Sequence, residues 1–324
     1  MIELFEEAKA MIKEANKIYV VAHINPDGDA IGSTFAIYLA LKNIGKDVGV
    51  VMPACSDIFK FLPSIDECVE NVNVEKYDLL IALDSSDYTR LAISDEDYKK
   101  ANKVIMLDHH QIARPYGDFR YINDKKSSAS EIAYLFLNDL GLAINKDIAT
   151  LLYTGIMTDT GSFNYSNASP ETHRVIADLL EYGAESVDVC KRLNDTIKES
   201  KLRLVARAVD NMEVMFDGNL RYSYVSYDEI NELGVHDEDA EGMTNYLRSV
   251  EGTEVAVYVR GKQDGSLKVS LRSGGRVDVS KIAIHFGGGG HPRASGYTML
   301  DELDVGKEKL IEIVGEMLND NTSN

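Results

Sequence analysis

The chain has 324 residues, of which 44% are hydrophobic and 27% are charged, so it is long enough for two domains with their own cores. Its 34 basic and 53 acidic side chains give a formal net charge of −19. This charge argues against binding to long duplex nucleic acid, which depends on neutralising many phosphates.

Further sequence features exclude other classes of protein. No apolar run reaches the roughly 18 residues of a membrane helix, so we expect no membrane partner. The three cysteines, Cys55, Cys68 and Cys190, are odd in number and lack CxxC spacing, which argues against a disulfide framework or a thiolate metal site. Residues 1–17 read as an acidic amphipathic helix without the features of a signal peptide, and we expect a cytoplasmic protein.

Up to about residue 185, short apolar segments alternate with helical patterns. Several of the segments are continuous apolar runs, which are typical of a parallel sheet covered on both faces. We predict strands over 17–23, 47–52, 77–84 and 103–110, and helices over 29–43, 128–140, 145–158 and 170–182. This alternation predicts a doubly wound, mainly parallel α/β domain over residues 1–187.

The pattern changes after a polar linker and connecting helix, which we place at residues 188–207. A hairpin is predicted around Asp217-Gly218, followed by strands in TEVAVYVR and SLKVSLRS. A short helix over 279–285 precedes a run of four glycines, and a final amphipathic helix covers about 303–318. We predict a smaller α+β domain over residues 208–324.

Acidic and histidine side chains follow the predicted strands of the first domain. His23, Asp27 and Asp29 follow the first strand, Asp84 ends LLIALD, and VIMLDHH ends in Asp108, His109 and His110. Asp159 lies at the end of an apolar helical run. Because ligands of parallel sheets bind at the carboxyl ends of the strands, we expect these groups to converge on one site.

Clustered carboxylates cannot all remain ionised unless cations neutralise them. Asp27, Asp29, Asp84 and Asp159 carry four negative charges, which match two divalent ions. With imidazole from His23 and His109, this mixed set of nitrogen and oxygen donors favours manganese, with magnesium, iron or cobalt as alternatives. Two such ions can activate water for phosphoryl displacement. Pro-Asp-Gly is also common turn chemistry, and a single Asp at a strand end is more often a cap.

Residues 248–296 form a basic segment, with eight basic and four acidic side chains. Its glycines can present consecutive N–H groups to an anion, and an Arg can grip phosphate bidentately. Solvated strand faces and ordinary loops would explain the same composition. The predicted substrate-binding residues are Arg248, Arg272, Ser273, Gly288, Gly289, Gly290, His291 and Arg293.

The motifs HINPDGDAIGS, LDSSD, LDHH and TDTGSF, in this order and spacing, resemble the four motifs of the DHH phosphoesterase superfamily. GGGGHPRASG resembles the signature of its type 1 DHH-associated C-terminal domain. The resemblance covers nearly the whole chain, which is similar to the bacterial nano-RNase (NrnA-type) branch, also known as pAp phosphatases. This resemblance implies hydrolysis of short oligoribonucleotides to mononucleotides, and of adenosine 3′,5′-bisphosphate (pAp) to AMP.

The resemblance also implies a role for each site residue. His23, Asp27 and Asp84 would hold one ion, and Asp29, Asp84, His109 and Asp159 the other, with attack by a water that bridges the two metals. His110 would face the scissile phosphate, and Asp108 would orient the histidines. The active site would lie in the cleft between the domains, and a homodimer is expected from the family.

Two other functions remain open on the sequence. The first is a phosphodiesterase of cyclic or linear dinucleotides, such as pApA or pGpG, in second-messenger turnover. The second is a non-catalytic nucleotide-binding module, which would be expected to lack some of the metal ligands.

Overall fold

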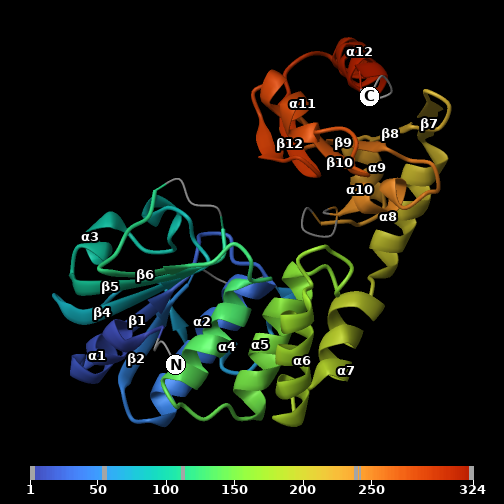
Figure 1. Cartoon of the computed structure of the whole chain (residues 1–324). Helices are drawn as coiled ribbons and strands as arrows, with labels where there is room; N and C mark the ends of the chain where they lie inside the picture. Colours follow the sequence, from blue (N-terminus) through green and yellow to red (C-terminus); the bar gives the residue numbers. More distant parts are fainter. Residues whose placement is uncertain (1–3, 53–56, 111–113, 237–239, 241, 321–324) are drawn as a thin grey trace. The chain divides into compact units, whose positions relative to one another are not determined.

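The computed structural model describes the chain except for residues 1–3, 53–56, 111–113, 237–239, 241 and 321–324. The chain divides into two compact units, residues 1–196 and 197–324. Figure 1 shows the elements of both units. The predicted linker over 188–207 includes the point of division, and the position of the active site between the two domains stays a prediction.

A parallel six-stranded sheet forms the centre of the first unit. Its strand order is β3-β2-β1-β4-β5-β6, and every neighbouring pair is parallel. The strands are β1 (Lys17–Val21), β2 (Asp47–Val51), β3 (Cys68–Val69), β4 (Tyr77–Leu83), β5 (Ala101–Asp108) and β6 (Phe119–Ile122). The direction of strand succession reverses between β1 and β4, and this switch point is where open α/β sheets bind ligands.

Side chains of β1 alternate between two cores because successive residues of a strand point to opposite faces. Ile18 and Val20 belong to the larger core beneath helices, whereas Tyr19 and Val21 belong to a smaller core on the other face. The helices are α1 (Glu6–Glu14), α2 (Gly28–Asn43), α3 (Asp95–Tyr98), α4 (Ala129–Asp139), α5 (Lys146–Asp159), α6 (Pro170–Glu181) and α7 (Ser186–Cys190). Figure 1 shows α2, α4 and α5 on one face of the sheet and α3 on the other.

The second unit contains a mixed six-stranded sheet in the order β11-β12-β10-β9-β8-β7. Its strands are β7 (Met212–Met215), β8 (Leu220–Val225), β9 (Val255–Gly261), β10 (Leu267–Ser273), β11 (Gly289–His291) and β12 (Ala294–Met299). Only the β8–β9 pair is parallel among the strand pairs described for this sheet. Its helices are α8 (Glu199–Asp210), α9 (Tyr227–Glu232), α10 (Met243–Arg248), α11 (Val279–His285) and α12 (Leu303–Asp320).

The predicted fold class is confirmed: a parallel sheet with helices precedes a smaller mixed α/β unit. The hairpin at Asp217-Gly218 forms between β7 and β8. Strands β3, β6, β11 and β12 were not predicted. Strand β3 has only two residues, and β6 alternates between half-buried and exposed positions. Cys68 and Cys190 are free, and Cys55 lies outside the described residues. Within the described chain, no helix combines the length and apolarity needed to cross a bilayer.

Candidate active site

Two histidine and aspartate clusters lie beside the carboxyl ends of β1, β4 and β5. In the first cluster, His23 Nε2 lies 3.6 Å from Asp84 Oδ2 and 4.0 Å from Asp27 Oδ1. One donor atom from each of these three side chains lies within 4.8 Å of the others. This is the set that the sequence resemblance assigned to one ion.

The second cluster centres on His109 Nε2. This nitrogen lies 3.5 Å from Asp84 Oδ1, 3.6 Å from Asp159 Oδ2 and 3.9 Å from Asp29 Oδ2. Asp159 is the last residue of α5, and Asp29 lies in the first turn of α2. Asp84 and His109 directly follow strands β4 and β5, so the fold brings these four groups together from distant parts of the chain. Asp84 contacts both His23 and His109, and therefore lies between the two clusters.

Asp27 serves the fold as well as the cluster. Its Oδ1 accepts hydrogen bonds from the backbone N–H groups of Asp29 and Ala30, both at 3.0 Å, and so caps the N-terminus of α2. This is the capping role that the sequence left as an alternative. The oxygen that caps the helix, Oδ1, is also the one that lies 4.0 Å from His23 Nε2. An ionised carboxylate has two oxygens with about four lone-pair sites, so capping and metal binding are compatible.

Asp29 is buried and held by the first turn of α4. Its Oδ2 accepts from the backbone of Ala129 at 2.6 Å and its Oδ1 from that of Ser130 at 2.8 Å. These N–H groups have no partner within their own helix, and the helix dipole also favours an anion at this end. The N-terminus of α4 therefore fixes the orientation of the Asp29 carboxylate.

The Asp84 backbone is strained at the end of β4. Its φ of 53° lies in the left-handed region, which is unusual for a residue other than glycine and costs about 1–3 kcal/mol. Such strain is found where the surroundings fix a functional side chain. Burial opposes ionisation of Asp84, but interactions with His109 and His23 outweigh it and hold its pKa below the usual range.

Burial and neighbouring charges also shift the pKa values of Asp29, Asp159 and His109. Burial, followed by the charges of Asp84 and Asp159, raises the pKa of Asp29. Burial also raises the pKa of Asp159 to about 6, against the opposing effect of His109. For His109, burial lowers the pKa, but Asp84, Asp29 and the other carboxylates raise it to about 10. The cluster therefore attracts positive charge.

Asp108 orients the histidine pair that follows it. It is fully buried, and its Oδ1 accepts from the backbone N–H groups of His109 at 2.7 Å and His110 at 3.1 Å. The same oxygen lies 2.8 Å from His110 Nδ1, and this hydrogen bond raises the pKa of His110. The His110 side chain is 43% exposed, so it is held at one nitrogen while remaining accessible.

The donor set fits divalent cations. In the described part of the chain, Asp84 Oδ1 is buried and has no hydrogen-bond partner, and it faces the histidine and aspartate side chains of the cluster. Buried polar atoms are normally satisfied, so unpartnered atoms among carboxylates need another source of positive charge or donors. Imidazole and carboxylate donors suit divalent metals such as manganese, magnesium or cobalt, and the cluster includes no thiolate.

Further residues that were not predicted from the sequence support this site. Ser128 caps α4 by accepting from the Glu131 backbone, and the buried Glu131 carboxylate accepts from Ser127 and Thr172. Asn167 donates to the backbone oxygen of Asp159. The helix over 128–140 was predicted, and the S-x-x-E spacing of Ser128 and Glu131 is a helix-start signal that could also have identified these two supporting residues.

In the second unit, strand register brings two of the predicted binding residues near each other. Arg272 of β10 and His291 of β11 both pair with Ala294, which lies on the strand between them. Arg272 donates to Asn245 of α10 at 3.1 Å, and Arg248 lies three residues later in this helix. Arg272, His291 and Arg248 thus belong to one local region of the unit.

Ser273 differs from these residues because its hydroxyl forms hydrogen bonds that stabilise the loop after β10. It is buried, donates to the Glu254 carboxylate at 3.1 Å and accepts from Gly275 N at 2.9 Å. Glu254 also accepts from the backbone of Arg276 and Val277. This network fixes residues 273–277, and direct contact between Ser273 and a substrate stays a prediction.

The predicted glycines form an edge strand instead of a simple loop. Gly289–His291 make β11, which pairs antiparallel with β12 at the end of the sheet. A Cβ on Gly288 would lie 2.3 Å from the Gly296 carbonyl oxygen, and Gly290 has φ 140°. These two positions need glycine for close strand packing, while an edge strand also leaves some backbone donors outside the sheet. Arg293 is exposed, and its guanidinium lies beside Gly275.

The comparison with known proteins agrees with these two units. A model described as DHH family, N-terminal domain matches residues 17–156, and a model of the DHHA1 domain matches residues 217–320. A protein of Thermus thermophilus named bifunctional oligoribonuclease and PAP phosphatase NrnA is 34% identical over 93% of this chain and 90% of its own length. The chain belongs to the DHH family.

Two other members of the comparison support this assignment. The Bacillus subtilis protein with the same name is 30% identical to this DHH-family chain, over 87% of the chain and 90% of its own length. The solved structure of an exopolyphosphatase-related protein from Bacteroides fragilis is 28% identical and has a TM-score of 0.88. That match covers 98% of this chain and 95% of the solved chain.

Proposed function

We propose that this DHH-family chain is a metal-dependent phosphoesterase. It hydrolyses short oligoribonucleotides, of about 2–5 nucleotides, to mononucleotides, and pAp to AMP. The observation that carries the proposal is the paired His/Asp cluster joined by Asp84, in a chain whose full-length relatives are named oligoribonuclease and PAP phosphatase.

The ligand sets follow the two clusters. His23, Asp27 and Asp84 hold one divalent ion, and Asp29, Asp84, His109 and Asp159 hold the other. Manganese is the proposed metal, with magnesium or cobalt as substitutes, because the donors are imidazole and carboxylate. Divalent ions at such a site supply polarisation of the phosphoryl group and activation of water.

The chain's own groups orient the substrate and move a proton. Asp108 holds His110 through Nδ1, which leaves Nε2 available to donate a hydrogen bond or proton to an oxygen of the substrate phosphate. Burial around Asp84 and Asp108 strengthens the electrostatic interactions of the site. Arg272, His291, Arg248 and Arg293 of the second unit bind the terminal phosphate or base of the substrate, together with backbone groups at Gly288–Gly290.

A hydrolysis assay tests the proposal. Purified protein is given diribonucleotides and pAp with manganese, or with a chelator in its place. We expect mononucleotides and AMP only with metal, and none from Asp84→Ala. Asp147→Ala, an exposed position in the first turn of α5, should retain the wild-type rate. Binding of manganese without hydrolysis of either substrate would refute the proposal and favour a nucleotide-binding module.

A further inference from the structure

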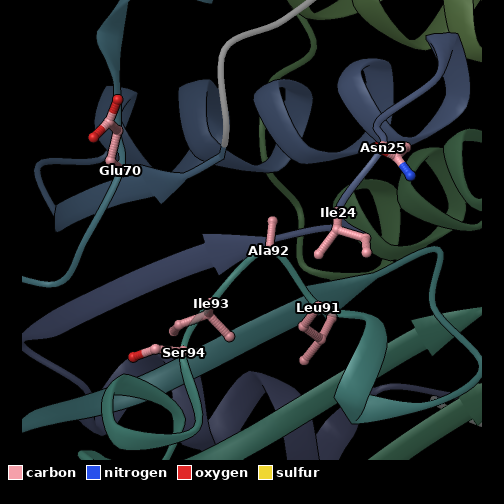
Figure 2. A pocket seen from close by; sticks show the side chains of 7 residues that line it. All are labelled: Ile24, Asn25, Glu70, Leu91, Ala92, Ile93 and Ser94. Carbon is pink, nitrogen blue, oxygen red and sulfur yellow. The ribbon is translucent and has the colours of Figure 1, made fainter. Parts of the chain in front are cut away.

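A cavity of about 480 Å³ lies beside the candidate active site. It is lined by Ile24 and Asn25, by Glu70 and by residues 91–94. Figure 2 shows Ile24, Leu91 and Ala92 close together, with Glu70 on another side of the cavity. The volume lies in the range of small-molecule binding sites, and no role described above uses it.

The wall of the cavity is joined to the segment that carries His23. His23 and Leu91 form an antiparallel β-bridge. The Ile24 backbone donates to the Arg90 carbonyl at 2.8 Å, and the Ala92 backbone donates to that of Ala22 at the same distance. Residues paired across such a bridge have Cα atoms about 4.5–5.5 Å apart. The cavity therefore starts within one nucleotide's length of the metal cluster.

The cavity is chemically unlike a phosphate site. Ile24, Leu91, Ala92 and Ile93 give it an aliphatic wall, and the Ile24 side chain is 48% exposed. None of the described residues that line it is basic, and Glu70 adds a negative charge. A phosphate would be repelled, whereas a flat uncharged ring would bury apolar surface against the wall.

The polar groups at the cavity are suited to the edge of a heterocycle. The Asn25 amide can donate and accept, and the Glu70 carboxylate accepts. The Ser94 hydroxyl caps α3 by accepting from the Asp97 backbone at 3.1 Å, which leaves its own proton free to be donated. An exocyclic amino group, as in adenine, guanine or cytosine, complements Glu70, and uracil has no such group.

We infer that this cavity binds the nucleobase of the nucleotide whose phosphate lies at the His/Asp cluster, with a preference for bases that carry an amino group. The inference rests on the proposed function and names a specificity element for it. The aliphatic wall binds the ring, and Glu70 and Asn25 read its edge. Phosphate binding and base binding are thus separated on the two sides of His23.

The first test fills the cavity without changing the backbone contacts of residue 92. We expect Ala92→Phe to raise KM for a diadenosine dinucleotide roughly 10-fold or more, because it displaces the base. KM for a dinucleotide with hydrogen in place of both bases should stay unchanged. Equal changes for both substrates, or no change for either, would overturn the inference.

The second test addresses base preference at the exposed Glu70. Glu70→Ala should reduce the ratio of kcat/KM for diadenosine over diuridine substrates, whereas Glu75→Ala, also exposed and outside the cavity, should preserve it. An unchanged ratio in Glu70→Ala would contradict the assignment of this carboxylate.

The third test does not depend on catalysis. Adenosine, which carries no phosphate, is titrated into protein labelled at the isoleucine methyl groups. We expect chemical-shift changes at Ile24 and Ile93, none at the exposed Ile44, and loss of these changes in Ala92→Phe. Absence of changes in the wild type would overturn the inference. A wild-type protein that binds adenosine here and cleaves no substrate would instead refute the proposed function alone.

Discussion

At the scale of single residues, the site uses polar groups that also build the fold. Asp27 caps α2 while facing His23, and Asp29 accepts two backbone donors of α4 while facing His109. One oxygen of Asp108 accepts hydrogen bonds from three donors of His109 and His110. Because backbone groups fix these three carboxylates, the fold arranges this part of the site before a cation binds.

The role of Asp108 can be tested by an isosteric change. Asp108→Asn keeps the shape but removes the charge that holds His110, so we expect kcat to fall roughly 10–100-fold, as for groups that orient metal ligands. Asp66→Asn, at an exposed position, should leave kcat unchanged. Wild-type activity in Asp108→Asn would show that His110 needs no such orientation.

Asp159 and Asp147 lie on the same helix and form a matched pair for metal binding. Asp159 faces His109, whereas Asp147 is exposed near the start of α5. We expect Asp159→Asn to weaken manganese binding measured by calorimetry by roughly 10-fold or more, because it removes a charged ligand. Asp147→Asn should bind as the wild type does, and equal affinity of both variants would contradict the ligand assignment.

At the scale of elements, helix packing determines how closely the carboxylates approach. A Cβ on Gly155 of α5 would lie 1.9 Å from Ser130 Oγ and 2.8 Å from Asp29 Oδ1. A Cβ on Gly32 of α2 would lie 2.4 Å from the Leu151 carbonyl oxygen. Both glycines permit close contact between helices, but only Gly155 adjoins a site carboxylate.

This difference predicts separate effects for two similar substitutions. Gly155→Ala and Gly32→Ala should each destabilise the protein by about 1–3 kcal/mol through overpacking, measured by urea unfolding. Gly155→Ala should also displace Asp29 and weaken manganese binding more than Gly32→Ala does, because only the Cβ on Gly155 meets the Asp29 carboxylate directly, whereas the one on Gly32 meets the backbone of Leu151 and Gly155. Binding is compared at a temperature where both variants are folded. Equal manganese affinity in the two variants would contradict a role for α5 packing in placing Asp29.

The Glu254 carboxylate makes the stability of the second unit depend on pH. Burial opposes its ionisation, but hydrogen bonds from Val277, Arg276 and Ser273 outweigh burial and lower its pKa. A lowered folded-state pKa means that the stabilisation is complete above the unfolded pKa of about 4.3 and is lost as pH falls through the folded value.

The loss of stability caused by substituting Glu254 should therefore depend on pH. We expect Glu254→Gln to reduce the stability of residues 253–277 by about 1–3 kcal/mol at pH 7, measured by hydrogen exchange. The difference from the wild type should shrink below about pH 4.3. Glu251→Gln, which is exposed, should show neither effect. A difference that is independent of pH would contradict the charged role of Glu254.

At the scale of the whole molecule, hydrophobic patterning predicted both units and most of their elements. The long apolar runs of β1, β4 and β5 were recognisable because both faces of these strands are buried. The edge strand β6, the support of Asp29 by α4 and the cavity beside His23 depend on contacts between distant segments, which periodicity does not record. The capping of α2 by Asp27 shows that local and tertiary roles can coincide in one residue.

Hydrolysis of very short oligoribonucleotides by this chain can be tested with a series of RNA substrates of increasing length. Labelled RNAs from dimers to 20-mers are compared with manganese present, for the wild type and Asp84→Ala. We predict that kcat/KM is highest for dimers to pentamers, falls steeply for longer RNAs, and is lost in the variant. Equal cleavage of dimers and 20-mers, or cleavage that survives in Asp84→Ala, would contradict it.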